Sequence, residues 1–259
     1  LWFAQHDEAL PAHFREACLQ WGLAADEYRD NGGFPRQVYV REGRRLEGCY
    51  FFTAGDALPE AEGKRPPLHP ASVTASHYAL DSHAVRKREA GRVHLDGFFS
   101  HPTAVYTVPY GVMVPRRIEN LLFPAAVSGS HVGFSTLRME PCWMALGEAA
   151  GTAAALAIDS RKDVRGIPTE SLQERLLRHG AMLVYLRNLK ADDPDYARVQ
   201  RLALRGFFPE WEAGLDRVLD GETARQWSIL AGREITADGT TTRREWLRRI
   251  TTNQFLKPN

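Results

Sequence analysis

The chain has 259 residues, of which 44% are hydrophobic and 25% are charged, a balance that is typical of a globular protein and excludes a disordered one. Its 33 basic and 32 acidic side chains give a formal net charge of +1, which argues against a nucleic-acid-binding protein. The three cysteines form no CxxC pair, so neither a disulfide framework nor a metal site is expected.

The first part of the chain has a helical pattern. Phe14, Cys18 and Trp21 recur at helical spacing and predict an amphipathic helix over residues 7–22, which ends at a glycine. A second, shorter helix is expected over residues 24–29.

Between about residues 37 and 127 the pattern changes to that of β-strands. We expect the residues 91–99 to pair with a preceding strand through a turn at residues 89–91. A loop rich in proline and charge, over residues 57–72, is long enough to be functional or mobile. These signals predict an α+β fold, with a mixed sheet flanked by helices. The expected strands are RQVYV, GCYFFTAG, GRVHLDGFF, AVYTVPYGVMVP (divided at residues 109–111) and NLLFPAAV.

A helix of small residues follows, over residues 142–158 with Pro141 in its first turn. Gly147 and Gly151 each weaken a helix interior by roughly 1 kcal/mol relative to alanine. Their presence predicts the close approach of another backbone or of a flat ligand, although a tightly packed core helix is the alternative. No membrane span is expected, because the apolar run is short and Glu148 lies in its middle.

The chain beyond this helix divides near Lys190. One more helix is expected between Pro168 and Gly180, and residues 1–190 are interpreted as the main domain. Residues 191–259 are predicted to form a small helical tail, which weakly resembles an S-layer-homology unit; a cap docked on the main domain is the favoured role. Its expected helices are one capped by Asp193 and ended by Gly206, one over residues 221–231, and one after a capping box of Thr242 and Glu245.

Residues 120–158, NLLFPAAVSGSHVGFSTLRMEPCWMALGEAAGTAAALAI, resemble the C-terminal cofactor motif of the FAD-dependent oxidoreductase family of the glutathione-reductase-like flavoproteins. Two upstream blocks, residues 32–56 and 76–97, resemble the same family, and VPYGVMVPRRIENLLFP continues the likeness. The resemblance implies FAD as the cofactor and a small-molecule substrate whose identity the sequence does not give. One departure is Pro124, which stands where the family more often has a polar contact to the cofactor.

No GxGxxG motif occurs in the chain, although such flavoproteins bind the ADP half of FAD with one. We therefore expect the chain to be the C-terminal, substrate-side portion of a longer enzyme. The dinucleotide-binding half is then its expected partner and is absent from this sequence. Alone, it is expected to be inactive and not to hold FAD tightly. The alternative is a non-enzymatic binding or assembly module derived from such a flavoprotein.

The predicted site residues follow from this likeness and from side-chain chemistry. A helix start carries partial positive charge, and Arg138 adds a full charge there, so both are expected to stabilise the flavin N1–C2=O edge. A histidine beside a carboxylate suits proton transfer, although a structural role is open for each histidine. Arg41 is the expected anchor for an anionic substrate; alternatively, Arg41, Arg44 and Arg45 pair with Glu42 and Glu47 on the surface. The predictions are catalytic His83 and His131, cofactor-binding Ser128, Ser130, Ser135, Arg138 and Met139, and substrate-binding Arg41 and Asp81.

Overall fold

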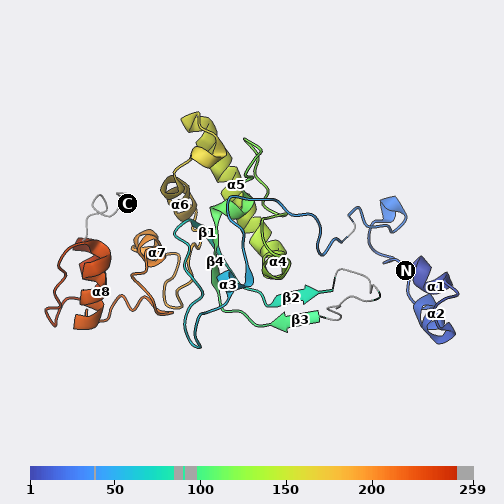
Figure 1. Ribbon diagram of the computed structural model, residues 1–259, viewed down its shortest axis with the longest axis horizontal. Helices are drawn as coiled ribbons and strands as arrows, with labels where there is room; N and C mark the ends of the chain where they lie inside the picture. Colours follow the sequence, from blue (N-terminus) through green and yellow to red (C-terminus); the bar gives the residue numbers. More distant parts are fainter. Residues whose placement is uncertain (38, 85–89, 91–97, 250–259) are drawn as a thin grey trace. The chain divides into compact units, whose positions relative to one another are not determined.

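The computed structural model describes residues 1–37, 39–84, 90 and 98–249 (Figure 1). The chain divides into two compact units, Leu1–Arg41 and Glu42–Asn259. Helices and short strands occur together in it, which confirms the predicted α+β class.

The first unit contains two short helices, α1 (Trp2–His6) and α2 (Ala12–Leu19). The prediction of one helix over residues 7–22 is wrong in its bounds, because Pro11 interrupts it. Proline disfavours helical geometry in the residue before it, so the chain can restart a helix only after this point. Neither helix has a buried residue.

The expected helix over residues 24–29 is also absent. The chain forms a single 3-10 turn, Arg29–Asn31, preceded by Tyr28 with a φ of 48°. A residue in this left-handed region cannot continue a right-handed helix, so the backbone geometry at Tyr28 explains the failure.

The second unit contains four short strands. Strand β1 (Ser72–Ser76) pairs antiparallel with β4 (Tyr106–Pro109), and β2 (Leu80–His83) pairs antiparallel with β3 (Phe98–His101). In the described ranges these make two separate two-stranded sheets, not the one mixed sheet that the sequence predicted. The pairing of residues near 99 with an earlier strand is confirmed, whereas residues 91–97 and the predicted turn lie outside the described residues.

Four expected strands do not form among the described residues. The second run of AVYTVPYGVMVP begins with a 3-10 turn, Tyr110–Met113, and makes no strand. GCYFFTAG makes only isolated bridges and then enters α3 (Ala54–Ala57), because Thr53 and Asp56 form a capping box. NLLFPAAV stays irregular; Asn120 has a φ of 53° and Pro124 lacks an N–H. RQVYV also has no strand, and its residue 38 lies outside the described part.

The predicted small-residue helix is α5 (Glu140–Ser160), which packs with β1 and with α6 (Thr169–Arg178) (Figure 1). Its buried face carries Leu146 and several alanines. Gly147 and Gly151 do not serve close approach, because a Cβ atom added at either one meets nothing within 4 Å. By length and composition α5 is apolar enough to cross a membrane, and it is the one such helix in the described part of the chain.

A short helix that the sequence did not predict precedes α5. It is α4 (His131–Leu137), which begins at the N-cap Ser130, where Ser130 Oγ accepts a hydrogen bond from Gly133 N at 2.9 Å. Gly133 is a close-approach glycine, since its added Cβ would lie 2.6 Å from the carbonyl oxygen of Phe52.

The three tail helices are confirmed as α7 (Tyr196–Leu204), α8 (Gly221–Ala231) and α9 (Arg243–Arg249). The predicted cap of the first one is wrong, because its N-cap is Asp195, whereas Asp193 accepts a hydrogen bond from the Asp195 N–H just before the helix. Trp227 of α8 is 1% exposed, lies against Phe207 and Phe208, and donates a hydrogen bond to the carbonyl oxygen of Phe207. The tail and the main body share one hydrophobic core. This continuity fits a docked cap, and the domain boundary near residue 190 stays a prediction.

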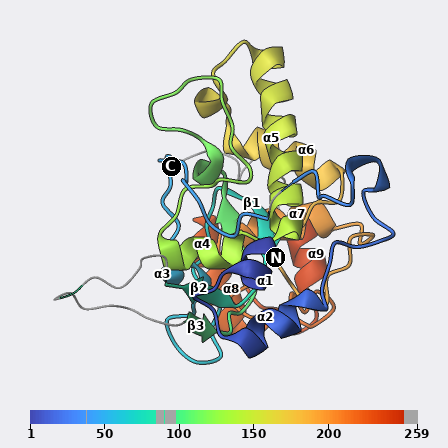
Figure 2. The ribbon, with the colours of Figure 1, turned by 90° about the vertical axis from the view of Figure 1, so that its right-hand side faces the viewer.

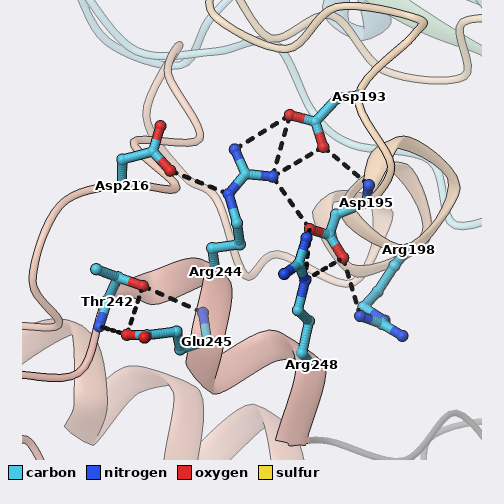
Figure 3. Close-up of polar contacts among 8 residues, drawn as sticks. All are labelled: Asp193, Asp195, Arg198, Asp216, Thr242, Arg244, Glu245 and Arg248. Carbon is cyan, nitrogen blue, oxygen red and sulfur yellow. Dashed lines mark hydrogen bonds and ion pairs between the residues drawn. The ribbon is translucent and has the colours of Figure 1, made fainter.

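A network of arginines and aspartates ties α9 to the segment that leads into α7 (Figure 3). The Arg244 guanidinium lies 2.9 Å from Asp193, 3.0 Å from Asp195 and 3.0 Å from Asp216. Arg248 reaches Asp195 at 2.8 Å, and the Asp195 side chain is 5% exposed. Charge-assisted hydrogen bonds therefore join the two ends of the helical tail.

Candidate functional site

Helix α4 lies beside strand β2, and their contact brings predicted site residues together (Figure 2). Ser135 Oγ accepts a hydrogen bond from the backbone N–H of Asp81 at 3.0 Å and donates to the carbonyl oxygen of Val132 at 2.6 Å. The fully buried Ser135 thus joins α4 to β2 through the hydrogen bond that it accepts, while the bond that it donates lies within α4. Its predicted contact with the cofactor stays a prediction.

Asp81 and Arg138 form a buried ion pair at the centre of this contact. The distance from Arg138 Nη2 to Asp81 Oδ2 is 2.7 Å, and the Arg138 side chain is 5% exposed. Arg138 is the C-cap of α4 and directly precedes Met139, the N-cap of α5. A cation is stabilised at a helix C-terminus, so the charge of Arg138 has two local counterparts, Asp81 and the end of α4.

The second carboxylate oxygen of Asp81 faces His83. His83 Nε2 lies 3.1 Å from Asp81 Oδ1, and the His83 side chain is 46% exposed. Arg138 and Asp81 therefore fix one side of this imidazole while its other side is open to solvent. A carboxylate-oriented, accessible imidazole is chemically suited to accept or donate a proton near neutral pH.

His131, the first residue of α4, lies next to His83. Its Nε2 atom is 2.9 Å from the carbonyl oxygen of His83, and its Nδ1 atom is 2.6 Å from Glu42 Oε2.

The alternative in which Glu42 and Glu47 pair with arginines 41, 44 and 45 is wrong for both glutamates. Glu42 pairs with His131 at 2.6 Å, and Glu47 pairs with Arg116 at 3.8 Å.

Sequence reasoning did not include Glu42 among the site residues. Glu42 lies in a charged run that is typical of a solvated surface. Its partner, His131, is far away in the chain, so no local spacing could have identified it.

The remaining predicted residues have different surroundings. Ser128 is fully buried, and its Oγ atom has no hydrogen-bond partner in the part of the chain that the structure describes. Ser130 is occupied as the N-cap of α4, and Met139 stays partly exposed. Arg41 belongs to the first unit, so its role in substrate binding stays a prediction.

A second polar network, which the sequence did not predict, lies at α3. Tyr50 donates a hydrogen bond to Asp56 Oδ1 at 2.5 Å, and His69 Nε2 lies 3.0 Å from the same oxygen. His69 Nδ1 lies 2.8 Å from Thr107 Oγ1. Burial acts to raise the pKa of Asp56, but the hydrogen bonds from His69, Tyr50 and Thr53 outweigh it and lower that pKa to about 2. Burial also raises the pKa of Tyr50. This network fastens α3 to β4.

No metal centre accompanies these networks: within the described residues no three histidine, cysteine or acidic side chains gather in a way that could hold a metal ion. In the comparison with known families, residues 3–176 match the family described as FAD dependent oxidoreductase. The comparisons with curated proteins and with solved structures give no match.

Proposed function

The chain belongs to the FAD dependent oxidoreductase family, whose match covers more than half of its 259 residues, and on that premise we propose that it forms the substrate-side portion of such an enzyme. The dinucleotide-binding half then comes from a polypeptide segment outside these residues. The lack of any GxGxxG motif in the sequence supports this division.

Three of the predicted residues are chemically suited to one edge of a flavin. Ser128 offers a buried hydroxyl with no hydrogen-bond partner among the described residues, and a buried polar group normally has one. Ser128, Met139 and the Arg138 charge are the groups that would hold the flavin N1–C2=O edge. When bound, FAD supplies hydride or electron transfer, while the protein supplies orientation and charge.

The observation that carries the proposal is the shared carboxylate of Asp81, which contacts Arg138 through one oxygen and His83 through the other. In this arrangement His83 takes up or releases the substrate proton at Nδ1, while Asp81 orients the ring through Nε2. Arg138 keeps Asp81 ionised and in place. The substrate is a small molecule that loses or gains a proton together with a hydride.

The test uses the complete enzyme with its flavin. Removing a positive charge beside the flavin disfavours its anionic reduced form, and about 1.4 kcal/mol corresponds to about 30 mV for a two-electron couple. Arg138→Met should therefore lower the reduction potential by some tens of millivolts. Asp81→Asn removes the neighbouring negative charge and should raise it. Potentials that stay unchanged in both variants contradict the placement and favour the assembly-module alternative.

The chain of 259 residues by itself is predicted to bind FAD weakly. The contacts to the ADP half lie outside it, and charge-assisted hydrogen bonds contribute roughly 1.5–3 kcal/mol each. Titration of the purified chain with FAD, followed by flavin fluorescence, should show no stoichiometric complex. A yellow protein with one bound FAD would show that the ADP site lies within these residues.

A further inference from the structure

The imidazole of His131 lies between two hydrogen-bond acceptors. Its Nε2 atom is 2.9 Å from the carbonyl oxygen of His83, a group that accepts hydrogen bonds and cannot donate them. Its Nδ1 atom is 2.6 Å from Glu42 Oε2. A neutral imidazole has one N–H and one lone pair, so a neutral ring that donates from Nε2 to the His83 carbonyl oxygen presents the lone pair of Nδ1 to Glu42 Oε2, which is unfavourable. The contact between Nδ1 and Oε2 is an ion pair without hydrogen-bond geometry, and it is favourable when the ring carries a positive charge.

The burial of Glu42 supports the same protonation state. Its side chain is 9% exposed, and among the described residues its contact with His131 is the ion pair that balances its charge. A buried carboxylate without a counter-charge is strongly unfavourable. Imidazole is ordinarily a stronger base than a carboxylate, so the proton between the two groups belongs on the ring.

Within the described part of the chain, the only ion pair that Glu42 makes is the one with His131. The charged and titratable groups on the segments next to α4 have contacts of their own. Asp81 and His83 of β2 face each other and Arg138; Asp56 of α3 faces Tyr50 and His69; and Arg45 lies over the Phe134 ring and donates a hydrogen bond to the carbonyl oxygen of Gly129.

We propose that Glu42 is a positioning residue that holds His131 as an imidazolium, so that His131 is a fixed positive charge beside His83. The two histidines then have separate tasks. His131 does not accept a proton, and its Nε2–H fixes the backbone of His83, whose exposed ring remains the group that exchanges protons. The meaning of this division for catalysis rests on the proposed function, whereas the protonation state of His131 does not.

The experiment records ring ¹⁵N–¹H correlations of the complete chain labelled at its histidines, at pH 7 and without FAD. The His131 signals are assigned with His131→Asn. We expect protons on both ring nitrogens of His131 in the wild-type chain. In Glu42→Gln the ring should lose one proton and show one nitrogen with a free lone pair, and Glu42→Asp should restore the doubly protonated pattern. Glu47→Gln is the matched control, because Glu47 contacts Arg116 on the surface, and it should leave the His131 signals unchanged.

A wild-type spectrum with one unprotonated nitrogen on His131 overturns the proposal, and so does a Glu42→Gln ring that stays doubly protonated. If Glu42→Gln does not fold, the wild-type spectrum alone decides. The measurement needs no cofactor, so its result is independent of whether the chain functions as a flavoenzyme portion. A doubly protonated His131 together with unchanged flavin potentials would retain this inference and reject the proposed function.

Discussion

The Asp81 carboxylate is the residue on which the candidate site depends, since its two oxygens hold Arg138 and His83. This pairing changes what a substitution of Arg138 should do to the fold. The sequence placed Arg138 at the start of a helix, where its loss would be tolerated. In the structure its loss removes a cation that lies 2.7 Å from the partly buried Asp81 carboxylate.

Arg138→Met is therefore predicted to lower the free energy of unfolding by about 2–3 kcal/mol, somewhat less than for a fully buried pair because Asp81 is partly exposed. Urea denaturation of the chain measures this. Asp81→Asn combined with Arg138→Met should recover part of the loss, because the carboxylate that Arg138 neutralises is then absent as well. Strictly additive losses in the double variant would show that the two side chains do not depend on each other.

Asp56 gives a pH dependence at the residue scale. Its pKa falls from the ordinary value of 3.8 to about 2 in the folded chain. The folded form thus binds fewer protons than the unfolded form, and the resulting stability is present above about pH 4 and lost as the pH falls towards 2. We expect about 1–2 kcal/mol from this term, after allowing for solvent screening.

Unfolding measured between pH 4 and pH 2 should accordingly have a shallower pH slope in Asp56→Asn than in the wild type. Asp159→Asn is the control, because Asp159 pairs with Arg175 on the surface and its side chain is 61% exposed. Equal slopes in Asp56→Asn and the wild type would contradict the assignment.

At the scale of elements, the glycines of α4 and α5 differ in the space around them. Gly133 of α4 meets the Phe52 carbonyl oxygen and the Thr53 backbone, whereas Gly147 of α5 has open space beside it. Gly133→Ala is predicted to destabilise the chain by about 1–3 kcal/mol through backbone displacement. Gly147→Ala should stabilise it by about 0.5–1 kcal/mol. Thermal unfolding of the two variants should show shifts of opposite sign, and shifts of equal sign would be evidence against this distinction.

The sequence predicted the long helices better than the other elements. α5 and α8 have clear start and stop residues, such as the Asp220 N-cap and the terminal Gly232 of α8, and these act locally. α4 was missed because its glycine and its hydroxyl-bearing residues have weak helix propensity, while its stability comes from packing on β2 and α3. The strands are four or five residues long, so alternation could not define their number or partners.

The site was predictable in its chemistry and only partly in its geometry. Asp81, His83, His131 and Arg138 could be chosen from residue type and likeness to a family, and the structure brings them together. That Glu42 faces His131 depends on tertiary contacts between distant segments. The same is true of the network at Asp56, where each partner comes from a different part of the chain.

At the scale of the whole molecule, the helical tail depends on Arg244. The hydrogen bond from Arg244 holds the pKa of Asp193 below the ordinary range. Removing Arg244 would also take one positive charge away from the buried Asp195 carboxylate. Arg244→Gln is predicted to lower the free energy of unfolding by about 2–4 kcal/mol and to expose the tail to limited proteolysis.

The control for this variant is Arg225→Gln. Arg225 pairs with Glu222 on the surface, with side chains 68% and 60% exposed, and such a pair contributes about 0–1 kcal/mol. Equal effects of the two substitutions would mean that the network in Figure 3 does not hold the tail in place.

The position of Trp227 between two phenylalanines affects the wavelength at which the chain fluoresces. An indole enclosed in a dry aromatic pocket emits at shorter wavelength than one surrounded by water, and Trp227 is 1% exposed. Trp2 and Trp21 of the first unit, at 72% and 73% exposure, already have the emission of hydrated indoles. The red shift of Trp227 emission during denaturation therefore reports on the second unit, and a small quencher such as iodide should reduce the emission of Trp2 and Trp21 while leaving that of Trp227 largely unchanged.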